Sequence, residues 1–389
     1  MRLKQTKTVN TAMIAGSLLA TVAMAQPPSY KVFDLGAVGP NGQPFALTDN
    51  GLAAGAAQTG NTMQAVLWYK GRMLELFKPT GSNSIAFGVN RGGQAVGGAQ
   101  TGTPDPQGED FCGFAALGLT SSGTSCIAFL WQNGGIQELP TLGGNNGVAN
   151  QINGAGDAVG MAEKNRPDST CPSGGPQKLE FKPAAWQNRI VREMPTYAGD
   201  PDGDAHAIND SGQAAGGSGV CAAFNPVWLT NLQPLHALLW ESGKVVDLGN
   251  LGGTGHGDGI MALNLNNNGQ VIGSSDLPGD ATFHAFLWTH ETGMQDIGTL
   301  PGDVDSAAIG INDNGQIVGV SIDANFNPRA FLRQGQELID LNTLVPADSP
   351  LDLASACSIN AAGEIVGFAF DSSFNVHAYL AVPINNSHT

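Results

Sequence analysis

The sequence predicts an all-β protein, a seven-bladed β-propeller made of four-stranded antiparallel blades. Three short phrases recur in a fixed order along the chain, a kind of self-similarity typical of propellers, solenoids and arrays. Each phrase has the alternation or the turn residues of short strands. The composition agrees, because 54 Gly, 22 Pro and only 13% charged residues favour turn-rich β-structure over helix.

The clearest unit runs from His284 to Ser321 and contains HAFLW, then GMQDIGTLPG, then AAIGINDNGQIVG. In AAIGIN, straight alternation would place Ala307, Ile309 and Ile311 on one face of a first strand. The segment 313–315 (DNG) predicts a hairpin turn, because Asn and Asp bond turn backbone and glycine accepts positive φ. GQIVG is then the second strand, an HAFLW-like segment the third, and a DLG-like segment an exposed fourth.

Seven such units can be counted. A turn glycine and a second glycine four residues later mark the first hairpins at Gly51 and Gly55, Gly93 and Gly97, Gly156 and Gly160, Gly212 and Gly216, Gly269 and Gly273, Gly315 and Gly319, Gly363 and Gly367. The last unit lacks a fourth strand, whereas Lys31 to Gly36 (KVFDLG) is a fourth strand with no unit before it. We expect this segment to pair with the strand from His377 to Ala381 and close the ring.

Two kinds of residue recur so regularly that we assign them structural roles. One is the Asn that begins each hairpin turn, whose amide can satisfy turn backbone, at Asn90, Asn153, Asn209, Asn266, Asn312 and Asn360, with Thr48 in the first unit. The other is the Trp that ends most third strands, expected in the core between blades, at Trp68, Trp131, Trp186, Trp240 and Trp288.

The phrases HAFLW, DIGTL and INDNGQIVG resemble the repeats of a bacterial extracellular family called HAF after its His-Ala-Phe segment. The resemblance covers most of the chain and implies an exported repeat protein of unassigned function. This chain departs from the pattern at the His position, which is too varied to be catalytic, since it holds Gln64, Ile127, Pro183, His236, His284, Arg329 and His377.

The N-terminus predicts a cleaved signal peptide over residues 1–25, because basic residues precede an apolar run and small residues fit cleavage before Gln26. A transmembrane helix is disfavoured, since the run is short and interrupted. We therefore expect a single propeller domain over 26–389, exported to the periplasm or beyond, with no membrane span in the mature chain.

The net charge is −16, and it becomes −19 without the three basic residues of the leader. Such an acidic protein is unsuited to nucleic acid. We expect a monomer with an unknown extracellular ligand, carbohydrate or protein. Six basic residues could form a local patch or could simply solubilise one loop and an outer strand, namely Lys164, Arg166, Lys178, Lys182, Arg189 and Arg192.

Long insertions separate the second and third strands of three consecutive units, near 98–126, 161–181 and 217–235. In a propeller these links share a face with the links that precede each first strand, and function usually lies in such loops. Phe224 and Trp228, in the third insertion, could stack on a sugar or another flat ligand. The alternative is packing of the insertion onto its own blade.

Four of the five cysteines lie in these insertions, and an exported context favours disulfides. We expect Cys112 to pair with Cys126 and Cys171 with Cys221, although the spacing alone leaves other pairings open. Cys357 lies in a first strand and is interpreted as a small buried residue.

Acidic loops in blades four to six suggest a calcium site, since the alternating aspartates of GDPDGDAH offer oxygen ligands. The proposed ligands are Asp200, Asp202, Asp204, Asp303 and Asp305, with His206, His256 and Asp258 as further ligand-binding candidates. The alternative is turn chemistry, because one repeat position is polar in five of the seven units and lies near glycine in several of them, at Asn41, Asn83, Asn146, Asp202 and Asp305.

The chain contains no GxSxG elbow, HExxH motif or phosphate loop. The sequence therefore favours a non-enzymatic binding or interaction module with an unknown ligand. The alternative is an extracellular propeller enzyme that acts on a carbohydrate or ester, with a carboxylate from Asp202, Asp258 or Asp305 as acid, base or metal ligand.

Overall fold

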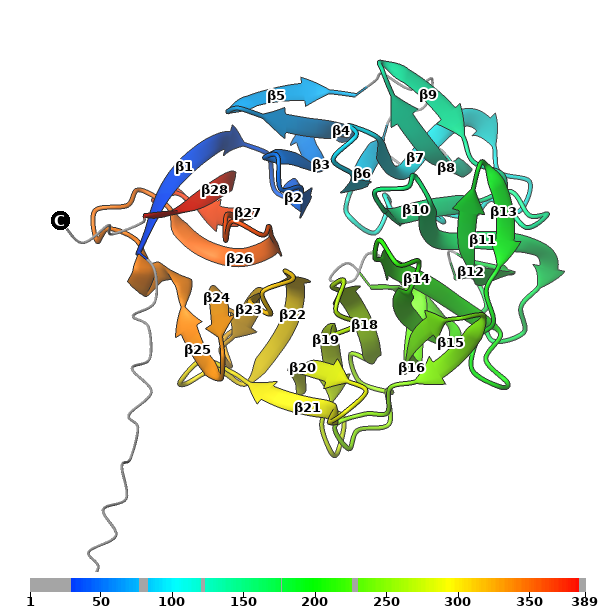
Figure 1. Ribbon diagram of the computed structural model, residues 1–389. Coiled ribbons are helices and arrows are strands. Elements are labelled where there is room, and N and C mark those ends of the chain that lie inside the picture. Colours follow the sequence, from blue (N-terminus) through cyan, green and yellow to red (C-terminus); the bar gives the residue numbers. More distant parts are fainter. Residues whose placement is uncertain (1–28, 77–82, 120–122, 176, 226–229, 385–389) are drawn as a thin grey trace, which may run out of the picture.

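The computed structural model describes residues 29–76, 83–119, 123–175, 177–225 and 230–384. They form seven four-stranded antiparallel sheets set as blades around a central axis (Figure 1), which confirms the predicted seven-bladed β-propeller. The predicted signal peptide lies outside the described residues. Within the described ranges, no helix is long and apolar enough to cross a membrane.

In the first four blades the strands follow chain order. Blade one contains β2 (Gln43–Leu47), β3 (Leu52–Thr59), β4 (Thr62–Tyr69) and β5 (Arg72–Glu75). Blade two contains β6 (Ser84–Val89), β7 (Ala95–Pro104), β8 (Thr124–Gln132) and β9 (Gly135–Glu138). Blade three contains β10 (Gly147–Ile152), β11 (Ala158–Pro167), β12 (Leu179–Gln187) and β13 (Ile190–Glu193). Blade four contains β14 (Asp202–Ile208), β15 (Ala214–Asn225), β16 (Thr230–Glu241) and β17 (Lys244–Asp247).

The remaining blades follow the same plan until the ring closes. Blade five contains β18 (Ile260–Leu265), β19 (Val271–Asp276), β20 (Phe283–Thr289) and β21 (Gly293–Gly298). Blade six contains β22 (Asp305–Ile311), β23 (Ile317–Ile322), β24 (Pro328–Gln334) and β25 (Glu337–Asp340), followed by the 3-10 helix η1 (Leu341–Leu344). Blade seven contains β26 (Asp352–Ile359), β27 (Ile365–Phe370), β28 (Val376–Ile384) and, from the other end of the chain, β1 (Ser29–Ala37).

The two ends of the described chain meet in blade seven. Strand β1 pairs antiparallel with β28, with Val32 opposite Ala381, and Figure 1 shows dark-blue β1 beside red β28. Tyr30 of β1 is fully buried in a core that also contains side chains of blade six. The predicted closure by the N-terminal strand is confirmed.

The straight alternation expected of AAIGIN is wrong, because each first strand contains a β-bulge. In β22, Ala308 pairs with Gly319 and Gly310 pairs with Val318, which leaves Ile309 as the extra residue. Ile311 consequently packs with Ala308 in the core between blades five and six instead of sharing a face with Ile309. A bulge re-aims the side chain of its extra residue, and Ile309 faces the propeller axis.

The second glycine of each pair lies opposite this bulge. A Cβ atom at Gly319 would overlap the main-chain oxygen of Ala307, so no larger residue fits. The same overlap with a first-strand oxygen occurs at the six equivalent glycines, Gly55, Gly97, Gly160, Gly216, Gly273 and Gly367. Glycine inside a strand is a common mark of a bulge or a close backbone approach.

The recurring asparagines tie the turns to one another. Asn312 Oδ1 accepts hydrogen bonds from the amides of Asn314 and Gln316, and its Nδ2 donates to the oxygen of Asn360 in the next blade at 2.9 Å. Asn90, Asn153, Asn209, Asn266 and Asn360 make the same bond across blades. In blade one, where the position is Thr48, Asn50 donates to Arg91 O instead. The structural role predicted for these asparagines is confirmed.

The tryptophans also join blades, as predicted. The indole Nε1 atoms of Trp131, Trp186 and Trp240 each donate a hydrogen bond to the preceding blade. The acceptors are backbone oxygens of residues just after its last strand, namely Leu76, Pro140 and Pro195. Trp68 is buried against side chains of blade seven, and Trp288 packs with side chains of blade four.

Both expected disulfides are present, Cys112 to Cys126 and Cys171 to Cys221. Cys357 is free and buried. The three insertions are partly strand, because β7, β8, β11, β12, β15 and β16 all extend into the predicted loop ranges. The disulfides therefore brace lengthened hairpins and their loops.

Candidate binding site

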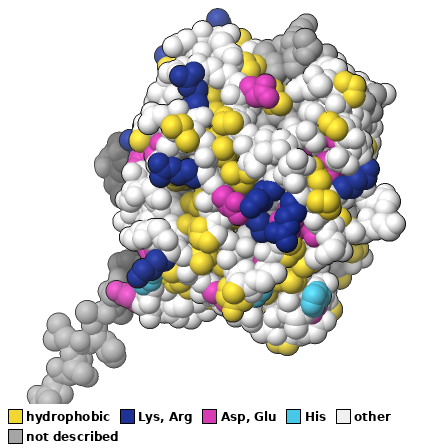
Figure 2. Space-filling view, turned by 90° about the vertical axis from the view of Figure 1, so that its right-hand side faces the viewer, with side chains coloured by type: hydrophobic (Ala, Val, Ile, Leu, Met, Phe, Trp, Pro, Cys, Tyr) yellow, Lys and Arg dark blue, Asp and Glu magenta, His cyan; other side chains and the backbone are white. Residues whose placement is uncertain are grey.

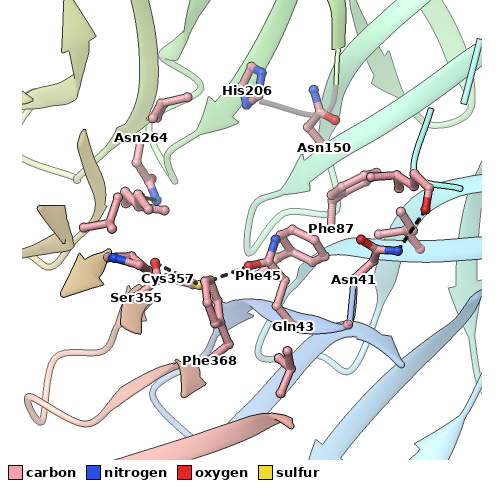
Figure 3. Close-up of a pocket in the computed structure, with 18 of the residues that line it drawn as sticks. Asn41, Gln43, Phe45, Phe87, Asn150, His206, Asn264, Ser355, Cys357 and Phe368 are labelled. Atoms are coloured by element: carbon pink, nitrogen blue, oxygen red, sulfur yellow. Dashed lines mark hydrogen bonds between the residues drawn. The ribbon is translucent and has the colours of Figure 1, made fainter. Parts of the chain in front are cut away.

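A cavity of about 450 Å³ lies at the centre of the ring. Figure 3 shows side chains from different blades pointing into this common space. Pockets that hold small molecules usually measure roughly 300 to 1,000 Å³ and are mostly apolar with a few polar groups. The central cavity has both properties.

Seven bulge residues line this cavity, one from each blade. They are Phe45, Phe87, Asn150, His206, Leu263, Ile309 and Cys357. Because the bulge turns the side chain toward the axis, one repeat position determines much of the cavity surface. Sequence reasoning selected only His206 of these seven as a site residue. The signal for the others was available, since a glycine within each second strand is a bulge marker.

Apolar side chains cover most of the lining. The rings of Phe45 and Phe87 lie 5.0 Å apart in a tilted arrangement. Leu117 reaches the cavity from the first insertion, and Phe368 and Phe370 reach it from β27. The insertion in blade two therefore contributes to the site, as the predicted placement of loops on one face implied.

Polar groups gather on the side of blades three and four. Asn150 Nδ2 donates to Asp204 Oδ1 at 2.7 Å, and His206 Nε2 lies 3.1 Å from Asp204 Oδ2. Asp204 itself is buried, so its carboxylate is held behind the two residues that face the cavity. Across the cavity lie Gln43 and Ser355.

Cys357 adds a weakly polar group to the same lining. Burial raises the pKa of the Cys357 thiol to about 12. The thiol is therefore protonated at neutral pH and lacks the thiolate that a nucleophile needs.

The structure does not assemble the predicted calcium site. Asp200 Oδ2 lies 2.5 Å from Ser218 Oγ and 2.8 Å from His236 Nδ1, whereas Asp202 Oδ1 accepts from the amide of Phe181. Asp200 is therefore occupied by side chains of its own blade and Asp202 by a backbone amide of blade three. Asp204 is engaged with Asn150 and His206. Among the described residues, one group of acidic, His and Cys side chains has its ligand atoms close enough together to hold a metal ion, namely Asp168, Cys171 and Cys221. Its two cysteines form a disulfide.

Asp202 is fully buried. Burial and a hydrogen bond with Asp168 raise the pKa of Asp202 to about 9, so its carboxyl is protonated at neutral pH. Its repeat position has a structural task, because Asn83, Asn146 and Asp305 also accept the amide of an early third-strand residue of the preceding blade. Contacts between blades therefore explain the polar residue at this position in blades two, three, four and six.

Asp303 and Asp258, the other acidic candidates, lie in different surroundings. Asp303 pairs with Arg329 Nη2 at 2.8 Å. Asp258 has an exposed side chain. Partial desolvation of its carboxyl and the negative charges of Asp276 and Asp305 raise the pKa of Asp258. His256 is exposed on the same loop.

The aromatic and basic candidates of blades three and four form no site that the structure describes. Trp228 lies outside the described residues, and Phe224 lies in β15 at a position where only the backbone is described. Lys164 and Arg166 pair with Glu193 and Glu180. Figure 2 shows the Lys and Arg side chains of this side of the ring scattered rather than joined in one field, which agrees with a solubilising role.

Fold and cavity define the molecule as a closed seven-bladed β-propeller with an apolar centre. No family model matches the chain, and no curated protein matches it. Among solved structures, the β-propeller domain of the Trilobed protease from Pyrococcus furiosus is 7% identical, with 93% of this chain and 99% of that chain covered and a TM-score of 0.49.

Two further solved structures are less similar by TM-score. An Aleuria aurantia lectin mutant in complex with Fucalpha1-6GlcNAc is 7% identical, covers 91% of this chain and 99% of that chain, and has a TM-score of 0.39. TolB from Acinetobacter baumannii is 12% identical, covers 85% and 79%, and has a TM-score of 0.35. Similarities this low assign no activity to the chain.

Proposed function

We propose that this protein is an exported binding module whose central cavity takes a small, uncharged and mainly apolar molecule. The observation that carries the proposal is the convergence of seven bulge residues, one from every blade, on a single cavity of about 450 Å³. The backbone of each blade supports this arrangement through the bulge and the glycine opposite it. A rigid scaffold with a preformed apolar pocket is the usual form of a small-molecule site.

The lining determines the expected charge of the ligand. Its described residues include no Lys, Arg, Asp or Glu, and the imidazole of His206 lies 3.1 Å from the buried carboxylate of Asp204. A charged ligand would therefore lose hydration without gaining a free partner of opposite charge. Asn150, Gln43 and Ser355 can hydrogen-bond one or two polar groups of the ligand. An apolar body with a hydroxyl, amide or carbonyl group fits this arrangement.

Export and family membership belong to the same proposal. Two disulfides are typical of oxidising compartments outside the cytosol, and the predicted leader over residues 1–25 would direct the chain there. We also propose that the chain is a member of the HAF repeat family, on the phrases quoted above.

We favour binding over hydrolysis. A catalytic carboxylate must reach its substrate, and Asp202 is fully buried and protonated at neutral pH. The protonated thiol of Cys357 is equally unsuited to nucleophilic attack.

A fluorescence titration with the neutral probe N-phenyl-1-naphthylamine tests the cavity. We expect saturable binding with a blue-shifted emission, because the probe leaves water for an apolar pocket. Ile309→Trp fills the cavity from a bulge position and should weaken probe binding at least tenfold. Leu74→Trp, on exposed strand β5, is the matched control and should bind like the unmodified protein. Absence of saturable binding, or equal binding by Ile309→Trp, would contradict the proposal.

A further inference from the structure

Two hairpins of adjacent blades end in the same kind of turn with phenylalanine at its tip. In blade six the turn is 323–327 (DANFN), between β23 and β24, and in blade seven it is 371–375 (DSSFN), between β27 and β28. We call these two turns the Phe tips. Phe326 is 85% exposed and Phe374 is 84% exposed, the two highest values among large apolar side chains of the described residues.

Each Phe tip is held by its own hydrogen bonds. Asp323 Oδ1 accepts from the amides of Asn325 and Asn327 at 2.8 and 2.9 Å, and Oδ2 accepts from Asn327 Nδ2 at 2.9 Å. Asp371 makes the equivalent three bonds in the second turn. The bonds from the Asn side chains and amides lower the pKa of both carboxyls. The turns are therefore preorganised, with their carboxylates occupied.

The backbone at the Phe tips is unfavourable for phenylalanine. Phe326 has a φ of 64° and Phe374 a φ of 62°, in the left-handed region that suits glycine or asparagine and that bulky residues rarely adopt. Neither ring is buried in the core, so folding gives no reason to place phenylalanine at both positions. Strained backbone positions of this kind are concentrated at functional sites.

The Phe tips stand beside the cavity mouth. Ile322 and Pro328, at the base of the first hairpin, line the cavity, and so do Phe370 and Val376 at the base of the second. Blades six and seven are neighbours in the ring (Figure 1). Both tips link a second strand to a third strand, as the long insertions do, so they lie on the same face of the ring in adjacent blades.

We propose that the Phe tips bind a neutral polysaccharide. A flat exposed ring can stack on the C–H face of a sugar. The tips also carry uncharged hydrogen-bonding side chains, including Asn325, Ser372 and Ser373, while Asp323 and Asp371 are occupied by hydrogen bonds within their own turns. Two similar elements on adjacent blades fit a ligand whose own units repeat, because the second contact follows the first at high effective concentration. The net charge of −16 repels anionic polymers.

Native electrophoresis in gels that contain a polysaccharide tests this assignment. The panel is hydroxyethylcellulose, laminarin, galactomannan and dextran, with alginate as the anionic comparison. We expect at least one neutral polymer to retard the protein. Phe326→Gly with Phe374→Gly should abolish the retardation, and each single variant should weaken it at least tenfold.

Glycine is the chosen replacement for both phenylalanines because it adopts the left-handed backbone conformation without strain. A loss of binding would then not result from misfolding of the turns. The double variant should therefore unfold at the same temperature as the unmodified protein or at a higher one, and it should still bind N-phenyl-1-naphthylamine in the cavity. Leu74→Ala, which shortens an exposed apolar side chain of β5, should be retarded normally.

Three outcomes would overturn the proposal. The first is that no neutral polymer of the panel retards the protein, and the second is equal retardation of the double glycine variant. The third is binding to phosphatidylcholine vesicles in flotation that depends on both phenylalanines and occurs without retardation by any polysaccharide. That result would assign the Phe tips to a lipid surface.

Discussion

His377 Nδ1 lies 3.0 Å from each carboxylate oxygen of Asp34, although 343 positions separate the two residues in the chain. The same pair occurs within blade five, where His284 Nδ1 lies 3.0 Å from Asp296 Oδ2. The N-terminal strand therefore reproduces the side-chain contacts of a fourth strand as well as its backbone pairing. Ring closure in this propeller is complete in both respects.

Removal of residues 26–37 should lower the unfolding midpoint markedly and cause aggregation, because β28 would be left with an unpaired edge. Thermal melting followed by light scattering measures both effects. An unchanged midpoint would show that the closing strand contributes nothing to stability.

Substitution of Tyr30 tests the side-chain packing of β1 while its backbone pairing with β28 is retained. Tyr30 is fully buried, and its hydroxyl has no hydrogen-bond partner among the described residues. Tyr30→Ala should cost about 3 to 5 kcal/mol through the cavity it creates, whereas Tyr30→Phe should be close to neutral. Equal effects of the two substitutions in urea unfolding would contradict this account.

Asn312→Ala should lower the free energy of unfolding by about 2 to 4 kcal/mol. The substitution leaves two turn amides and the oxygen of Asn360 in the next blade without their buried partner. Asn314→Ala, in the same turn but exposed, is the control and should change stability by less than about 1 kcal/mol. Urea unfolding at neutral pH distinguishes them, and similar losses would remove the special role assigned to the Asn position.

Stability should fall as the pH rises, because of a buried carboxyl between blades two and three. Glu163 is fully buried, and burial, together with the neighbouring Glu109, raises the pKa of Glu163 from 4.5 to about 8. Between these values the folded protein holds a proton that the unfolded chain has released, so the unfolding free energy decreases by up to about 1.4 kcal/mol per pH unit. Below about pH 4 both states are protonated, and above about pH 9 neither is.

Glu163→Gln should flatten this decline, because the amide is neutral at every pH. Unfolding in urea at intervals from pH 5 to pH 9 measures the slope, and exposed Glu138→Gln serves as the control. Parallel slopes for Glu163→Gln and the unmodified protein would show that another group is responsible. The pKa of Asp202 is also raised, so the unfolding free energy of Glu163→Gln should still decline with pH, although less steeply than that of the unmodified protein.

The repeat made blade number, closure, tryptophan packing and the Asn position predictable, because each depends on the order of residues along the chain. The cavity was not predicted, because its lining depends on a bulge that alternation cannot show. Strict alternation places Ile309 on the same face as Ile311, whereas the bulge opposite Gly319 turns Ile309 toward the cavity. The calcium site failed to assemble for a related reason, since the partners of Asp200 and Asp202 come from strands distant in sequence.

The bulge position has a consequence for how this scaffold can change. Its residue stands outside the regular ladder pairing of its blade, so a new side chain at Phe87 or Leu263 leaves the strand pairing unchanged. It changes the cavity wall and the apolar cluster that packs behind that wall. The seven positions are coupled where their side chains touch, as Phe45 and Phe87 do at 5.0 Å between ring centroids, so neighbouring positions would have to be varied together. A combinatorial library confined to them would generate pockets of different shape and polarity within a single unaltered architecture.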